Sequence, residues 1–131
     1  MGEIIFWWYM LFFELLIPGL MIIFGRQFLK AAPKNINYAY GYRTTRSMKN
    51  KDTWSFAHKC IGGLWKNWGI ALVPISVVFM LFLYGRDTDT VGYTGLILVG
   101  VQLVAMFASI FIVESRLKRT FDENGIRKIK E

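Results

Sequence analysis

Three long apolar stretches constrain this chain more than any other feature of its sequence. They cover residues 4–24, 67–84 and 91–113; the first holds one ionisable residue, Glu14, and the other two hold none. A hydrocarbon core of roughly 30 Å needs about 20 apolar residues in a helix, because each residue adds about 1.5 Å. The sequence therefore predicts an all-α integral membrane protein with three transmembrane helices.

The overall composition agrees with a membrane protein. Of the 131 residues, 54% are hydrophobic and 17% are aromatic, whereas ordinary soluble domains are about 45–50% apolar. The first apolar stretch follows Met-Gly-Glu, with no basic segment before it and no small-residue cleavage site after it. It is therefore predicted to be a retained anchor and not a signal peptide. We expect residues 1–131 to form a single three-helix membrane domain.

Lysine and arginine gather in two segments of the chain. Of the 16, eight lie in residues 26–59 and six in residues 116–130, whereas the short connection at residues 85–92 holds one. Basic loops of membrane proteins remain in the cytoplasm. We therefore expect the loop 25–60 and the tail 114–131 to be cytoplasmic and the N-terminus to lie outside. This orientation explains the net charge of +7, so no nucleic-acid partner is predicted.

A helix with one aromatic face is predicted ahead of the second apolar stretch. Asn50 and Asp52 stand at its start, and either side chain can cap the first free amides. Aromatic and apolar residues then recur every three or four positions: Trp54, His58, Ile61, Trp65 and Trp68. We expect an interfacial amphipathic helix that begins near residue 52. Because Gly62-Gly63 would allow a bend, the sequence leaves open whether residues 52–84 form one helix or two.

The loop carries the most specific motif of the chain. It reads Gly41-Tyr42-Arg43-Thr44-Thr45-Arg46-Ser47-Met48-Lys49-Asn50, followed by Asp52-Thr53-Trp54, Ala57-His58 and Gly62. This pattern resembles the SdpI family of small bacterial membrane proteins, in which a Gly-x-Arg-Thr stretch precedes a Ser-hydrophobic-Lys-Asn/Ser turn and a Trp. The resemblance covers about residues 33–125, including a tail that begins at Glu114. Family members commonly have Asn where this chain has His58.

The resemblance implies a location and a function. It implies a multi-pass protein of the bacterial cytoplasmic membrane. The best-known member confers immunity on a cell that makes a secreted antimicrobial peptide, and it holds a soluble repressor at the membrane when toxin is present. That member is longer and has additional spans, so this chain resembles only the shared three-helix unit. The implied partners are the lipid bilayer, an antimicrobial peptide toxin, a soluble regulator at the cytoplasmic face and further copies of this chain.

Glu14 is the strongest candidate for a functional residue within the membrane. It lies about 15 Å into the first predicted helix, where an ionised carboxylate is costly unless it faces a partner or a wet cavity. Pro18 has no amide hydrogen for the carbonyl of residue 14, so the backbone is polar at the same place. Ser76 and Gln102 are expected at similar depth. We predict that these polar side chains form a cluster. The cluster is either a functional site or a set of hydrogen bonds that holds the helices together.

Arg43 and Arg46, with Lys49 behind them, are predicted to form a basic patch at the inner membrane surface. The simplest explanation is orientation and contact with lipid headgroups, worth about 1 kcal/mol per cation near anionic lipid. The spacing that resembles the family adds a structural role. We expect Arg43 to pair with Asp52 or with Glu114.

The other candidate residues are expected to have structural roles. Trp54 is expected to act as a packing and interfacial anchor. His58 is the only histidine, and the single cysteine, Cys60, cannot form an internal disulfide. No nucleophile–base pair, phosphate-binding glycine loop or set of metal ligands is found in the sequence, so we predict neither an enzyme nor a bound cofactor or metal.

The function expected from the resemblance is therefore binding. The chain would neutralise a membrane-active peptide and signal through its basic loop. The sequence leaves two alternatives open. One is a membrane scaffold or sensor that recruits a soluble regulator without binding a toxin. The other is a small transporter, which would need a homo-oligomer because three helices barely enclose an aqueous path.

Overall fold

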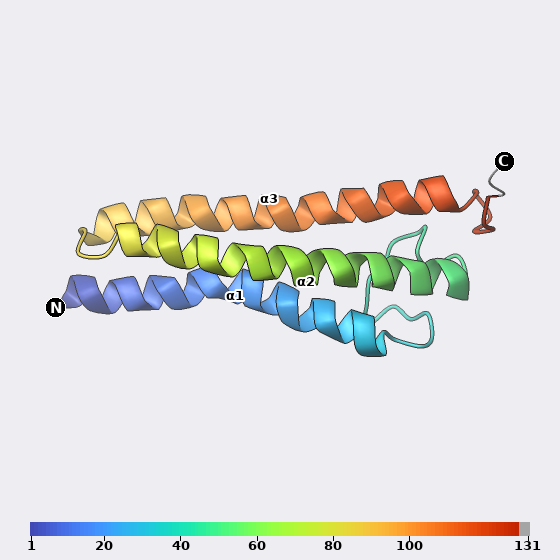
Figure 1. Ribbon diagram of the computed structural model, residues 1–131, viewed down its shortest axis with the longest axis horizontal. Helices are drawn as coiled ribbons and strands as arrows, with labels where there is room; N and C mark the ends of the chain where they lie inside the picture. The colour runs from blue at the N-terminus through green and yellow to red at the C-terminus, as the bar shows by residue number, and fades with distance from the viewer. Residues whose placement is uncertain (129–131) are drawn as a thin grey trace.

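The computed structural model describes residues 1–128, and these residues form three long helices. They are α1 (Gly2–Ala31), α2 (Lys51–Phe82) and α3 (Thr88–Thr120), which run side by side along the bundle (Figure 1). Each helix is long and apolar enough to cross a membrane. The predicted all-α architecture with three membrane-spanning helices is confirmed.

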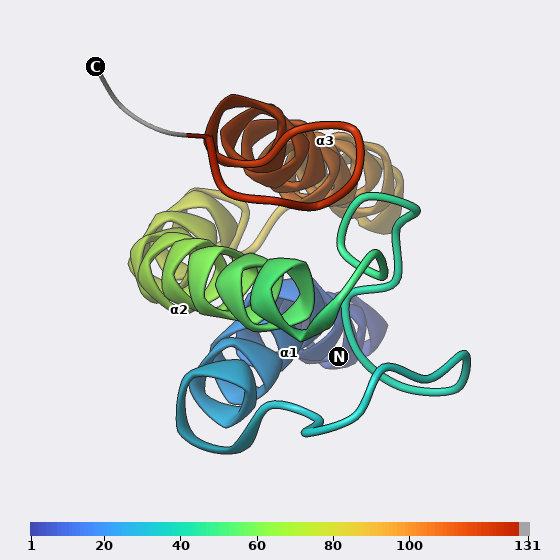
Figure 2. The same cartoon turned by 90° about the vertical axis from the view of Figure 1, so that its right-hand side faces the viewer.

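The two ends of the bundle differ. The N-terminus of α1 and the short connection at residues 83–87 lie at one end, which we call the turn end (Figure 1). The loop at residues 32–50 and the segment 121–128 lie at the other, which we call the loop end. Seen along its axis, α2 lies between α1 and α3, and the loop passes along one side of the bundle from α1 toward α3 (Figure 2).

α2 is one continuous helix of 32 residues. Its N-cap is Asn50, whose side chain accepts from the backbone N–H of Thr53 at 2.9 Å while the Thr53 hydroxyl accepts from the backbone N–H of Asn50 at 3.0 Å. This reciprocal pair is a capping box. The segment expected to form an interfacial helix is thus the first part of α2 and continues directly into the span. Gly62 and Gly63 do not interrupt the helix.

Each of the three predicted spans has one end that faces the loop end of the bundle. Contacts between the helices show that these three ends lie at one level. Gly25 of α1 lies so close to α2 that an added Cβ would be 2.5 Å from the backbone nitrogen of Lys66 and 2.8 Å from the carbonyl oxygen of Gly62. The indole N–H of Trp65 donates to the hydroxyl of Ser109 on α3 at 2.8 Å. All three helices continue past this level at the loop end, where they pack together with the loop.

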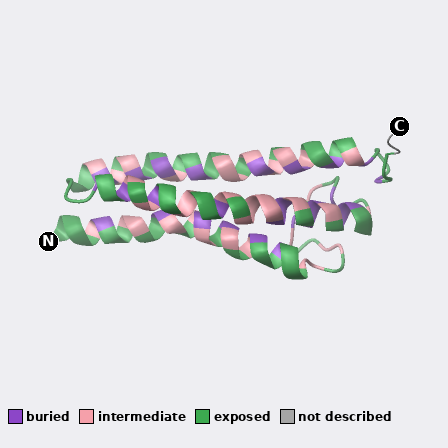
Figure 3. Cartoon of the chain, in the orientation of Figure 1, coloured by how far each residue is buried: buried purple, intermediate pink, exposed green. Residues whose placement is uncertain are grey.

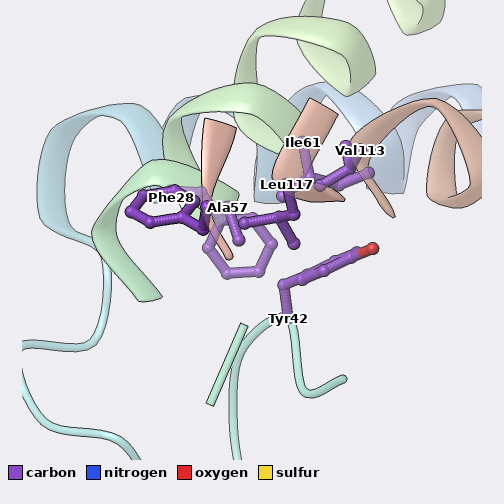
Figure 4. Packing of buried hydrophobic residues seen from close by; sticks show 7 residues of the cluster. Phe28, Tyr42, Ala57, Ile61, Val113 and Leu117 are labelled. Atoms are coloured by element: carbon purple, nitrogen blue, oxygen red, sulfur yellow. The ribbon is translucent and has the colours of Figure 1, made fainter. Parts of the chain in front are cut away.

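Two apolar clusters stabilise the ends of the bundle. The loop-end cluster joins all three helices and the loop through Phe28, Tyr42, Ala57, Ile61, Val113, Leu117 and Phe121 (Figure 4). The turn-end cluster consists of Trp7, Met80, Leu83 and Val91. Exposed residues run along the outer surfaces of the helices (Figure 3). Many of them carry large apolar side chains. That surface suits lipid, which does not penalise exposed apolar groups.

Candidate functional site

A polar layer lies between the two apolar clusters. Glu14, Ser76 and Gln102 come from the three different helices, and each is 0% exposed. The side-chain amide of Gln102 donates to the hydroxyl of Ser76 at 2.8 Å and to the backbone carbonyl of Glu14 at 2.8 Å. The structure thus brings together the three residues that the sequence suggested as a cluster.

The contact to the Glu14 carbonyl has a clear structural cause. Pro18 lies four residues later in α1 and has no N–H, so this carbonyl lacks its helical donor. α1 changes direction about half-way along its length (Figure 1), as helices do at an internal proline. Gln102 of α3 replaces the missing donor. An unsatisfied carbonyl in a membrane interior is costly, and this hydrogen bond removes that cost. It also joins α1 to α3 at mid-depth.

The carboxyl group of Glu14 has no such partner. Both of its oxygens are buried without a hydrogen bond, and so is Oε1 of Gln102. The carboxyl group points toward α3, since a Cβ added to Gly95 would lie 3.0 Å from Glu14 Oε1. The polar layer therefore holds three acceptor oxygens that no donor among the described residues satisfies.

A groove of about 420 Å³ opens between α1 and α3 at the turn end. Its lining residues are Phe6, Met10, Thr88, Asp89, Gly92, Tyr93 and Leu96. The walls are mainly apolar, and the exposed carboxylate of Asp89 lies at its rim. The methyl group of Met10 lies against Gly95, the residue that Glu14 Oε1 also contacts. Met10 therefore separates the groove from the Glu14 carboxyl group.

A second polar network lies at the loop end and is built by the motif of the loop. The hydroxyl groups of Tyr42 and Thr44 donate to one oxygen of Glu114 on α3, at 2.8 and 3.0 Å. The backbone N–H of Tyr42 donates to Nε2 of His58 on α2 at 2.9 Å. Burial, and then the hydrogen bond to Glu114, raise the pKa of the Tyr42 phenol. We call this set, Tyr42, Thr44, His58 and Glu114, the loop latch.

Short contacts within the loop support the latch. The hydroxyl of Ser47 donates to the carbonyl of Tyr42 at 2.9 Å and accepts from the backbone N–H of Thr44 at 2.9 Å. The side-chain amide of Asn50 donates to the carbonyl of Gly125 at 2.7 Å, which ties the segment after α3 to the start of α2. The motif residues therefore fix the loop to α2 through His58 and to α3 through Glu114.

Trp54 and His58 occupy adjacent turns of α2 beneath the loop. Trp54 is 2% exposed, and its indole N–H donates to the carbonyl of Pro33 at 2.7 Å. Gly41 has a φ of +115°, and a Cβ there would lie 2.7 Å from Nε2 of His58. Glycine is required at this position for both reasons. The histidine is thus a buried hydrogen-bond acceptor for the loop.

The predicted partners of Arg43 are wrong. Both oxygens of Asp52 accept from the guanidinium of Arg127 at 2.8 Å, because the segment after α3 folds back over the start of α2. Glu114 is occupied by the hydroxyl groups of the loop latch. Arg43 instead donates to the carbonyl of Tyr38. Its side chain is exposed, as are those of Arg46 and Lys49, so the loop presents cations at its surface.

Several residues of these sites were not predicted. Tyr42, Thr44 and Ser47 stand inside the loop motif, which was the available signal. Met10 and Gly95 carry no signal in the sequence, because their importance depends on which faces of α1 and α3 meet. Among residues 1–128, no three His, Cys, Asp or Glu side chains lie close enough together to hold a metal ion.

Removal of the Tyr42 hydroxyl tests the latch. We expect Tyr42→Phe to lower the free energy of unfolding by about 1–2 kcal/mol, because it removes a partly buried hydrogen bond to a carboxylate. Tyr40→Phe is the matched control, since Tyr40 is 39% exposed. Unfolding titrations of both variants in detergent measure the difference. Equal stability of the two variants would show that the Tyr42–Glu114 bond contributes nothing.

Comparisons with known proteins agree with the motif. A model of the SdpI/YfhL protein family matches residues 34–113, which cover most of the loop, α2 and most of α3. The chain is also similar to "Uncharacterized protein YfhL" of Bacillus subtilis (strain 168), with 37% identity over 60 residues that cover 46% of this chain and 54% of that protein. The match thus spans about half the length of that relative. No solved structure matches this chain. Because the family model covers more than half of the sequence, the chain belongs to the SdpI/YfhL protein family.

Proposed function

We propose that this chain is a membrane-embedded immunity protein of the SdpI type, which binds a membrane-active antimicrobial peptide and neutralises it in the bilayer. Membership of the family supports the proposal. The observation that carries it is the groove between α1 and α3, which is open, mainly apolar and bordered by Asp89. Membrane-active peptides are typically amphipathic and rich in Lys and Arg. Such a peptide matches both the apolar walls and the acidic rim.

The charge distribution supports an orientation in which the groove faces outward. Among the described residues, Arg86 is the only lysine or arginine at the turn end, whereas the loop and the segment after α3 at the loop end are rich in both. By the positive-inside rule, this distribution supports a loop end that faces the cytoplasm of a bacterial cell. A peptide that enters the membrane from outside would meet the groove first.

Filling the groove tests this function. Gly92 lines it, and Gly100 lies on the same helix, where an added Cβ would meet no other residue within 4 Å. A strain that lacks the gene, complemented with the wild type, should survive challenge with the candidate peptide. Gly92→Leu should abolish this protection because the new side chain fills the groove, whereas Gly100→Leu should retain it. Membrane fractionation confirms that both variants insert. Equal protection by both variants, or no protection by the wild type against any peptide tested, would reject the proposal.

Recruitment of a soluble regulator is the second candidate function. The exposed cations Arg43, Arg46 and Lys49 favour it, because they form a charged surface outside the spans. A loop variant with all three changed to alanine separates the two functions in the same strains. Protection that survives this change while a regulator leaves the membrane fraction would assign the groove to immunity and the loop to recruitment.

A further inference from the structure

The Glu14 carboxyl group is the largest unexplained polar feature of the bundle. Its side chain is 0% exposed, yet neither oxygen has a hydrogen-bond partner, and Gln102 Oε1 in the same layer has none either. The backbone carbonyl of Glu14 and the amide nitrogen of Gln102 already join the helices. That structural task does not use the carboxyl group. A glutamate at mid-membrane is expensive, so acceptors without donors point to a ligand that supplies donors.

We propose that Glu14 is a recognition site for a single cationic group on an otherwise apolar ligand held in the groove between α1 and α3. The inference rests on the proposed function, and it names the part of the peptide that is read: a lysine ammonium or an arginine guanidinium. The apolar part of the ligand lies between Phe6, Tyr93 and Leu96, which line the groove. The cation passes inward to the Glu14 carboxylate.

The charges along this path favour a cation and exclude an anion. Asp89 stands at the rim of the groove, Glu14 lies behind Met10, and the residues that line the groove include no lysine or arginine. An ammonium group offers three donors and a guanidinium five. Either can satisfy both carboxylate oxygens, with Gln102 Oε1 as a further acceptor in the same layer. A charge pair is strong in such a low-dielectric site, and an unpaired carboxylate there is costly.

Met10 controls access to the site. Its side chain lines the groove, and its methyl group lies against Gly95, next to Glu14 Oε1. Met10 and Glu14 are four residues apart, so they share one face of α1. Methionine is unbranched and has three rotatable bonds, so its methyl group can swing aside without disturbing the helices. Gly95 has no side chain of its own, so the Met10 methyl group occupies the space beside the carboxyl group.

A small probe tests the site without any toxin. The full chain, in nanodiscs of zwitterionic lipid and with ¹³C-labelled methionine methyl groups, is titrated with dodecylammonium. The chain has six methionines, and loss of one resonance in Met10→Leu assigns Met10. We expect a saturable shift of the Met10 resonance with dodecylammonium. Dodecanol has the same apolar chain and no charge. It should give no saturable shift of the Met10 resonance over the same concentration range.

Two variants decide whether the carboxylate is responsible. Glu14→Gln should weaken dodecylammonium binding by about tenfold or more, because it removes the charge partner and keeps the size. Glu3→Gln, which changes an exposed acid of α1, should leave binding unchanged. Equal binding by wild type and Glu14→Gln, or no saturable shift in the wild type, would overturn the inference.

The probe and the peptide challenge fail separately. If Gly92→Leu abolishes protection against a peptide and Glu14→Gln does not, the immunity function stands and the role of Glu14 is rejected. If dodecylammonium binds through Glu14 but the wild type protects against no peptide, the cation site stands and the immunity function is rejected.

Discussion

Replacing Gly62 by alanine should lower the free energy of unfolding by about 2–3 kcal/mol, because the added methyl group forces two helix backbones apart. A Cβ at Gly62 would lie 2.9 Å from the carbonyl oxygen of Gly25, 3.1 Å from Cγ of Leu29 and 3.2 Å from Cβ of Phe28. The first of these atoms is backbone and cannot turn away. α1 must therefore move, and the contacts of Gly25 with α2 are lost with it.

Gly63 provides the matched control one residue later in α2. Nothing lies within 4 Å of a Cβ placed there. Gly63→Ala should therefore keep the packing and gain helix propensity, with stability unchanged or higher by up to about 1 kcal/mol. Unfolding of both variants in mixed micelles, followed by circular dichroism, measures the difference. If the two substitutions had the same effect, the close approach of α1 and α2 at Gly62 would be wrong.

Trp54→Ala is expected to have a still larger effect. The side chain is buried at the loop end, outside the predicted spans, so its truncation should destabilise the packing of the loop end by about 3–5 kcal/mol. Trp54→Phe keeps most of the apolar contact and loses only the hydrogen bond to Pro33, which contributes about 1 kcal/mol. Amide hydrogen exchange of the loop and of the first turns of α2 should become faster in both variants. The increase should be larger in Trp54→Ala than in Trp54→Phe.

Trp8 is the control for the loss of an indole as such. It lies on α1 and is 58% exposed on the outer surface of the bundle. Trp8→Ala should leave exchange at the loop end unchanged. If Trp54→Ala also left it unchanged, the indole would be an interfacial anchor and not the packing centre beneath the loop, and the assignment of the motif to a structural latch would fail.

The polar cluster shows how far sequence reasoning reached. Depth along three predicted helices was enough to place Glu14, Ser76 and Gln102 in one layer, because residue number converts directly into height in a transmembrane helix. Pro18 identified the carbonyl that needs a donor. The sequence did not indicate that Gln102 supplies this donor, because that depends on how α3 is rotated about its own axis.

Arg43 shows where such reasoning failed. Its expected partners, Asp52 and Glu114, do lie at the loop end, so height was again predicted correctly. Which cation reaches a carboxylate depends on the path of the chain after α3, and the return of that segment brings Arg127 to Asp52. Exposed ion pairs are weak, so sequence spacing alone carries little information about them.

The number of spans, their level and the helical class follow from the amino-acid sequence alone, because apolar length and the need to satisfy every backbone group in lipid leave few alternatives. The packed bundle was needed to show that α2 is continuous through Gly62-Gly63, that the loop motif fastens Tyr42 to Glu114, and that Met10 stands between an open groove and Glu14. These features depend on which faces of the helices meet. Close packing of the whole bundle determines which faces meet, and the hydropathy of the sequence does not indicate them.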